Sequence, residues 1–152
     1  MSIINKVLTK NTTPQYRIER TLDSNGVLQC GSTFIDLTGI TGLGDSALAY
    51  AFVGCTNLTT PVVFTGITTL GNSCLQNCFQ NCTGLTSISF PVLTSTSFGG
   101  YTNQFNNMLS GVTGCTVHFP SNMQSVIGSW ADITAGFGGT NTVVLWDLPA
   151  TE

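Results

Sequence analysis

The stretch Gly-Ile-Thr-Gly-Leu-Gly-Asp-Ser at residues 39–46 recurs as Gly-Ile-Thr-Thr-Leu-Gly-Asn-Ser at residues 66–73. Each copy is followed, at the same spacing, by a phenylalanine and a cysteine: Phe52 and Cys55, then Phe79 and Cys82. Similar apolar patterns spaced by roughly 20 to 50 residues are typical of repeat proteins, in which each unit buries its apolar face against the next. The sequence therefore predicts one domain built from stacked, similar units.

A degenerate third unit begins at Cys115. The interval from Cys82 to Cys115 is longer than that from Cys55 to Cys82, which indicates a short insertion. We expect equivalent cysteines and leucines to line the shared interior, because free cysteine is among the most buried residue types. This structural ladder consists of Cys55, Cys82, Cys115, Leu58 and Leu85.

The order Leu-Gly-Asp-Ser, Ala-Phe and Gly-Cys-Thr-Asn-Leu-Thr within residues 43–59 resembles the BspA-like leucine-rich repeat family. The resemblance covers about residues 32–130 and is most specific over residues 40–61 and 67–91. Members of this family occur in bacterial surface adhesins, in proteins of mucosal parasites and in phages of gut bacteria. The resemblance thus implies a leucine-rich-repeat-like stack that binds proteins or cell surfaces.

The predicted fold is an α/β-type repeat solenoid, a short stack of strands joined by short helical or 3₁₀ turns. Strands are expected near residues 58–64, 85–90 and 117–119, and a short helix or 3₁₀ turn over residues 46–52 and 73–79. Ser121 is a candidate N-cap for a terminal helix over residues 121–130. The chain divides into an N-terminal arm (1–14) and one domain (15–150), made of a β-hairpin cap (15–31), repeat coils (32–120) and a C-terminal cap of helix plus strand (121–148).

Charge is unevenly distributed along the chain. The segment 1–20 holds every basic side chain, opposed only by Glu19, whereas the segment 21–152 holds six acids and no base. This distribution excludes a generally basic nucleic-acid binder. It predicts that the N-terminal segment either contacts something acidic, such as another copy or another protein, or remains a solvated tail. The assembly-anchor candidates are Lys6, Lys10, Arg17 and Arg20.

Cys74, Cys78 and Cys82 are spaced by four residues, so a helix would place three thiols on one face. With His118 they form a conceivable zinc ligand set, but the paired Cys-x-x-Cys spacing of structural zinc sites is absent. We favour buried packing thiols, with a disulfide and a metal site as the alternatives. The prediction is therefore no metal and no cofactor.

His118 is the only histidine, so any nucleophilic site that needs an imidazole base depends on it. Strand alternation predicts that His118 points away from its apolar neighbours Val117 and Phe119, and Cys115 lies too far along an extended chain to reach it. The aspartates are scattered singly, without the facing carboxylates of a glycosidase. The sequence predicts no enzyme.

The inserted segment of the third unit mixes aromatic rings with amides, a combination suited to adaptable recognition of a glycan or protein surface. Its surface-binding candidates are Tyr101, Asn103, Gln104, Asn106 and Asn107. The alternative is that Phe105, Met108 and Leu109 simply continue the core. Trp130 and Trp146 are expected to pack in the cap rather than to form sugar platforms.

The sequence predicts a non-enzymatic structural or adhesive protein. The first hypothesis is a bacteriophage virion component, assembled in the bacterial cytoplasm: a capsid or tail decoration, a fibre, or a receptor-binding element for host attachment. It would be anchored by its arm to other virion proteins or to copies of itself. The alternative is a bacterial cell-surface or extracellular adhesin module that binds a host protein or glycan. No nucleic-acid partner or membrane insertion is expected, since no apolar run approaches the roughly 20 residues of a spanning helix.

Overall fold

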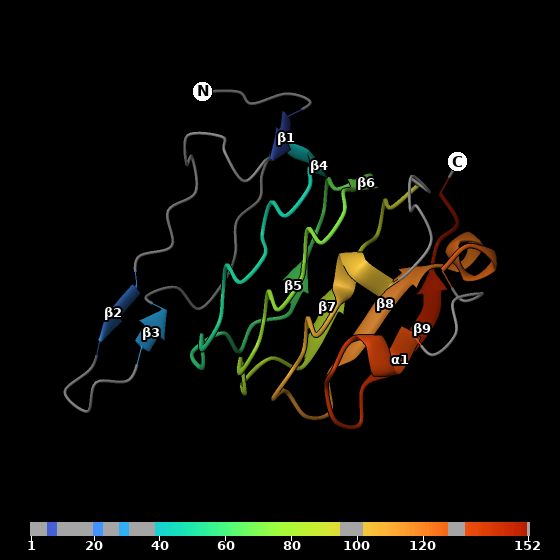
Figure 1. The fold of residues 1–152 in the computed structure, drawn as a ribbon. Coiled ribbons are helices and arrows are strands. Elements are labelled where there is room, and N and C mark those ends of the chain that lie inside the picture. The colour runs from blue at the N-terminus through green and yellow to red at the C-terminus, as the bar shows by residue number, and fades with distance from the viewer. Residues whose placement is uncertain are drawn as a thin grey trace.

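A computed structural model describes residues 6–8, 20–22, 28–30, 39–94, 102–127 and 133–151. The fold is of the α/β type, with mostly short parallel strands and few helices (Figure 1). The strands are β1 (Lys6–Leu8), β2 (Arg20–Leu22), β3 (Leu28–Cys30), β4 (Ile40–Leu43), β5 (Val62–Val63), β6 (Thr69–Leu70), β7 (Ser87–Ser89), β8 (Thr116–Pro120) and β9 (Val143–Leu148). The helical elements are two 3₁₀ helices, η1 (Thr102–Phe105) and η2 (Ser121–Ser125), and the single-turn α1 (Ile133–Gly136).

Two parallel sheets and one hairpin organise these strands. The larger sheet has the order β5-β7-β8-β9, and the second has the order β1-β4-β6. β2 and β3 pair in antiparallel fashion within the predicted hairpin region 15–31. Figure 1 shows the four strands of the larger sheet lying side by side, with β9 at one end.

From β4 onward, paired parallel strands are separated by a nearly constant length of chain, whereas β1 and β4 lie further apart in the sequence. Gly42 pairs with Thr69, as the recurrence of residues 39–46 at 66–73 predicts. Ser87 pairs with Thr116, so Cys115 lies directly before β8, at the level of the residue that precedes β7. The equivalence of Cys115 with Cys82 is therefore wrong, because Cys82 lies several residues further from its strand.

The segments expected to form a short helix or 3₁₀ turn, residues 46–52 and 73–79, form no helix but rows of turns, whose local hydrogen bonds span three residues. We call residues 45–54, 72–81 and 106–111 the first, second and third turn rows. In the first row, N–H groups alternate between two destinations: Ala49 donates locally to the Ser46 carbonyl (3.2 Å), while Leu48 donates across to the Cys74 carbonyl (2.8 Å). An α-helix would use every N–H locally. Here half of them join one row to the next.

A left-handed backbone recurs at every fourth residue of the first two rows. The positive-φ residues are Ser46, Tyr50 and Gly54 in the first row, Ser73, Asn77 and Asn81 in the second, and Asn107 and Gly111 in the third. Such residues bend the chain where an L side chain is ordinarily disfavoured. Their four-residue period explains why Cys74, Cys78 and Cys82 all lie buried without any helix.

One continuous apolar core lies between the strands and the turn rows. Phe64, Phe90 and Phe119 stack in succession at centroid distances of 4.7 and 5.2 Å, and Trp146 stacks on Phe119 at 5.2 Å. Trp146 thus packs at the end of the core, as expected. Stacked and edge-to-face aromatic pairs add roughly 0.5 to 1.5 kcal/mol each beyond their buried area.

The two ends of the chain differ from expectation in detail. At the C-terminal end, the expected helix is the five-residue η2, and Pro120 rather than Ser121 occupies the cap position, with no side-chain cap hydrogen bond. At the N-terminal end, β1 pairs in parallel with β4. Residues 6–8 of the predicted arm are therefore part of a sheet.

Candidate functional site

The outer face of the larger sheet carries the side chains that are not used in packing. In β8 buried residues alternate with half-buried ones, and in β9 half-buried residues alternate with exposed ones, because successive side chains point to opposite faces. The register aligns four outer residues, one from each strand: Val63, Ser89, His118 and Leu145. A second outer row consists of Ser87, Thr116 and Val143.

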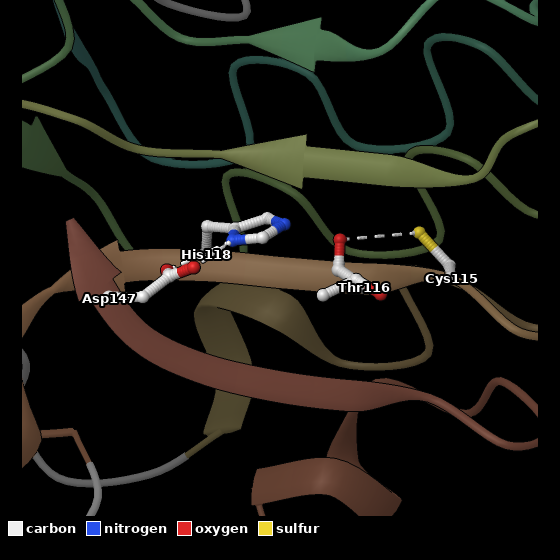
Figure 2. Close-up of polar contacts among 4 residues, drawn as sticks. All are labelled: Cys115, Thr116, His118 and Asp147. Carbon is white, nitrogen blue, oxygen red and sulfur yellow. Dashed lines mark hydrogen bonds and ion pairs between the residues drawn. The ribbon is translucent and has the colours of Figure 1, made fainter.

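His118 and Asp147 form an ion pair on this outer face (Figure 2). The His118 Nδ1 atom lies 2.9 Å from both carboxylate oxygens of Asp147. Nδ1–H donates to the carboxylate, so in the neutral ring Nε2 is the acceptor. The side chains are 24% and 47% exposed, and an ion pair this open to water contributes little to stability.

Cys115 does not approach His118. Figure 2 shows the two side chains well apart along β8, with the Cys115 Sγ near the Thr116 backbone oxygen at 3.8 Å. Cys115 is completely buried, whereas His118 stands on the opposite face of the sheet beside Asp147. The pair cannot act as a nucleophile and its base, because that chemistry requires hydrogen-bond contact between them.

No protein-family model, curated protein or solved structure matches this chain. The resemblance to the BspA-like family therefore stands on the sequence motifs at residues 40–61 and 67–91.

The buried cysteines are poor candidates for reactive thiols. Burial raises the pKa of Cys74 and of Cys115 to about 12, so both thiols stay protonated at neutral pH. The Cys82 thiol donates to the Phe52 carbonyl at 3.0 Å, a packing role in agreement with the ladder. Within the described ranges, no three His, Cys, Asp or Glu side chains gather as a metal-binding group.

Cys55 corrects one expectation. It is buried, as predicted, but it is disulfide-bonded rather than a packing thiol. The remaining ladder residues Leu58 and Leu85 each lie in the core at 1% exposure.

The inserted segment lies mostly inward. Phe105, Met108 and Leu109 are buried, so the core alternative is confirmed for these three residues. Gln104 is only 3% exposed, which removes it from any binding surface, and its Oε1 makes no hydrogen bond among the described residues. Asn106 is half-buried and Asn107 is exposed. Asn103 belongs to η1, and Tyr101 lies outside the described residues.

The assembly-anchor candidates fall partly outside the structure. Lys6 lies in β1 and Arg20 in β2, on different sheets, while Lys10 and Arg17 lie outside the described residues, as does Trp130. Among the described residues, no helix has the length and apolar character needed to span a membrane.

Sequence reasoning missed the His118–Asp147 pair. The two residues are far apart in the chain, and Asp147 carries no local motif. The available signal was the regular spacing of neighbouring parallel strands, which places His118 beside Leu145 and brings Asp147 within reach.

Proposed function

We propose that the chain is a short leucine-rich-repeat-like solenoid that serves as a non-enzymatic structural or adhesive protein. Support for the repeat comes from the nearly constant spacing of the parallel strand pairs and from the cross-row hydrogen bonds, which join similar segments throughout the described body. Each segment buries its apolar side chains against the next, which is the principle of a solenoid.

Within that class, we propose a bacteriophage virion component: a decoration, fibre or receptor-binding element of the capsid or tail. The charge distribution carries this proposal. All four basic residues precede residue 21, and the rest of the chain is acidic, so attachment through the N-terminal segment leaves the body to face outward. The body itself is solubilised by hydroxyls and amides rather than by charge, which suits a passive surface element.

The testing experiment replaces Lys6 and Lys10 by glutamate in the parent genome. Purified particles should then lack the protein, measured by immunoblot, while the expressed double variant keeps the circular dichroism spectrum and unfolding midpoint of the wild type. The matched control, Lys6→Arg with Lys10→Arg, keeps the charge and should be incorporated normally. Substitution is preferable to removal of residues 1–14, because removal would also delete β1 and uncover the edge of β4. Particles that incorporate the glutamate variant at wild-type level would refute the anchor.

A second candidate is a bacterial cell-surface adhesin module that binds a host protein or glycan. The disulfide at Cys55 favours it, since disulfides persist in oxidising surroundings outside the cytoplasm. Neighbouring reading frames separate the two candidates: capsid or tail genes accompany a virion protein, and surface or export genes accompany an adhesin.

A further inference from the structure

β9 forms one edge of the larger sheet, and within the described residues it pairs only with β8 (Figure 1). The Val143 N–H donates to the Cys115 carbonyl at 3.1 Å. In a parallel ladder, alternate residues of an edge strand turn their backbone groups toward the neighbouring strand. The N–H and C=O groups of Val144 and Trp146 therefore face away from β8, as a template for another strand.

This edge lacks the features that ordinarily prevent strand addition. β9 is the longest described strand, with six residues, no proline and no lysine. Its outer side chains Val143 and Leu145 are 48% and 38% exposed. Its one charged residue, Asp147, is held toward β8 by His118 at 2.9 Å (Figure 2). The opposite edge strand, β5, has only two residues and follows Pro61. Natural edges are shortened or carry charges and prolines; β9 is neither short nor interrupted by proline, and its one charge is paired with His118.

We propose that β9 pairs with β9 of a second copy, in antiparallel orientation, about a two-fold axis at Leu145. This register places Val144 opposite Trp146 of the other copy, so the outward backbone groups of the two strands meet. It also sets Leu145 against its own equivalent in a non-hydrogen-bonded pair, where side chains approach most closely.

Geometry selects this orientation. Both copies must present the same free edge of β9, and parallel pairing through that edge requires a half-turn about the strand axis, which puts the core of one copy on the side of the other copy's outer face. Antiparallel pairing relates the copies by a half-turn about the sheet normal, so both cores stay on one side of the joined sheet. It places Val143 opposite Asp147 and leaves each carboxylate with its own His118. A two-fold contact also closes on itself, giving a dimer rather than a filament.

The test is sedimentation velocity of the full chain over a range of concentrations. The wild type should form a species of twice the 16.0 kDa chain mass. Leu145→Lys places two lysines face to face at the axis and should raise the dimer Kd by about tenfold or more. The matched control is Val63→Lys, at a similarly exposed position on the opposite edge, and it should leave the Kd unchanged. A wild-type monomer at every concentration, larger open assemblies, or equal weakening by both variants would overturn the proposal.

A second variant tests the register and does not depend on affinity. With Leu145→Cys, the two introduced thiols face each other at a Cα separation of about 4.5 Å, within disulfide range. Added diamide, which accepts two electrons and two protons from the thiol pair, should then produce a covalent dimer on a non-reducing gel. Val63→Cys should not cross-link under the same conditions. Absence of cross-linking at residue 145, or cross-linking at both positions, would exclude the two-fold register. Neither test involves the N-terminal anchor, so the dimer and the virion role are tested separately.

Discussion

The two faces of the larger sheet share one strand register but carry different kinds of side chain. The inner column repeats an aromatic side chain within or directly after each strand: Phe64, Phe90, Phe119 and Trp146. The outer column, one residue earlier along each strand, never repeats a side chain: Val63, Ser89, His118 and Leu145. On the inner face each ring packs against the ring of the next strand, and this contact restricts the residue type. Outside, no such constraint operates, and the residue types vary freely.

This difference indicates where function can lie in the described part of the chain. The inner column provides the stability, because rings in stacking contact lose their neighbours when one of them is truncated. The outer column, with the His118–Asp147 pair and the exposed edge strand, is where change costs the fold little. The following predictions test this contrast.

The largest effect is expected for Phe90→Ala. Phe90 is fully buried between Phe64 and Phe119, so its loss should reduce the free energy of unfolding by about 3 to 5 kcal/mol. The adjacent Ser89→Ala, on the outer face, should change it by less than about 0.5 kcal/mol. Urea denaturation monitored by circular dichroism measures both. Similar losses for the two variants would remove the distinction between the faces.

The next largest effect is expected in thiol reactivity, which should differ between the outer face of the sheet and the core. An engineered Ser89→Cys should react with 5,5′-dithiobis(2-nitrobenzoate) on the order of a hundredfold faster than Cys74 or Cys115 in the folded protein, because burial raises the pKa of both native thiols to about 12. Chymotryptic mapping by mass spectrometry assigns the modified sites. Rapid labelling of Cys74 without denaturant would show that the core opens readily.

The same pKa shifts give a pH dependence of stability. A thiol in the unfolded chain has a pKa of 9.0, so above that pH the unfolded state releases protons that the folded state retains. The free energy of unfolding should therefore fall as pH rises from about 9 to about 12. Cys74→Ala should flatten this slope at the cost of some packing. Unfolding midpoints in urea at pH 8, 9.5 and 11 measure it, and a slope that is the same in wild type and variant would contradict the assignment.

Two glycines test whether contact with the adjacent turn row, in addition to the positive φ, excludes larger residues from the turn rows. A Cβ at Gly111 would overlap the Asn81 Oδ1 of the second row, whereas a Cβ at Gly114 would meet nothing within 4 Å. Both residues have positive φ, so alanine is strained at each. We expect a loss of about 2 to 3 kcal/mol for Gly111→Ala and about 1 kcal/mol for Gly114→Ala.

Calorimetric unfolding of these variants measures the difference. Asn81→Gly should recover part of the loss in the Gly111→Ala background, because it removes the clashing amide and itself tolerates the left-handed backbone. If Asn81→Gly gives no recovery, the whole loss of stability in Gly111→Ala comes from the strained positive φ at residue 111.

The smallest effect is expected for the ion pair on the outer face. A double-mutant cycle of His118→Ala and Asp147→Ala should give a coupling energy of about 0.2 to 1 kcal/mol, because both side chains are open to solvent. The coupling should also weaken at high salt, where screening is strong. A value well above this range would place His118 among the residues that stabilise the fold.

Much of the architecture could be predicted from periodicity. The recurrence of residues 39–46 at 66–73 has the spacing of the β4–β6 pairing, although no strand was predicted at either place, and alternation placed His118 on the face opposite Val117 and Phe119. The turn rows could not be predicted, because their hydrogen bonds connect residues that are distant in the chain. Their left-handed positions also include Ser46 and Tyr50, which carry no local signal for positive φ.

The candidate site was predicted less well than the fold. Gln104 was assigned to the surface from its polarity, yet its segment packs against the second turn row and buries it. The His118–Asp147 pair depends on the register between β8 and β9, which shifts between His118 and Pro120. Local sequence does not encode that shift. Side chains brought together by two distant strands can be found only once the pairing is known.

The alternating donors of the turn rows restrict how this chain can change in length. In the second row the N–H groups of Asn77, Phe79 and Asn81 cross to the third row, while those of Gln76, Cys78 and Gln80 bond locally. Deleting or inserting one residue would exchange local and cross-row acceptors for every later N–H of the row. It would also turn the buried thiols toward water. Single-residue insertions and deletions are therefore expected to be excluded from the rows. Divergence in length should be confined to the connections between rows and strands, where the interval already lengthens from the β5–β7 pairing to the β7–β8 pairing.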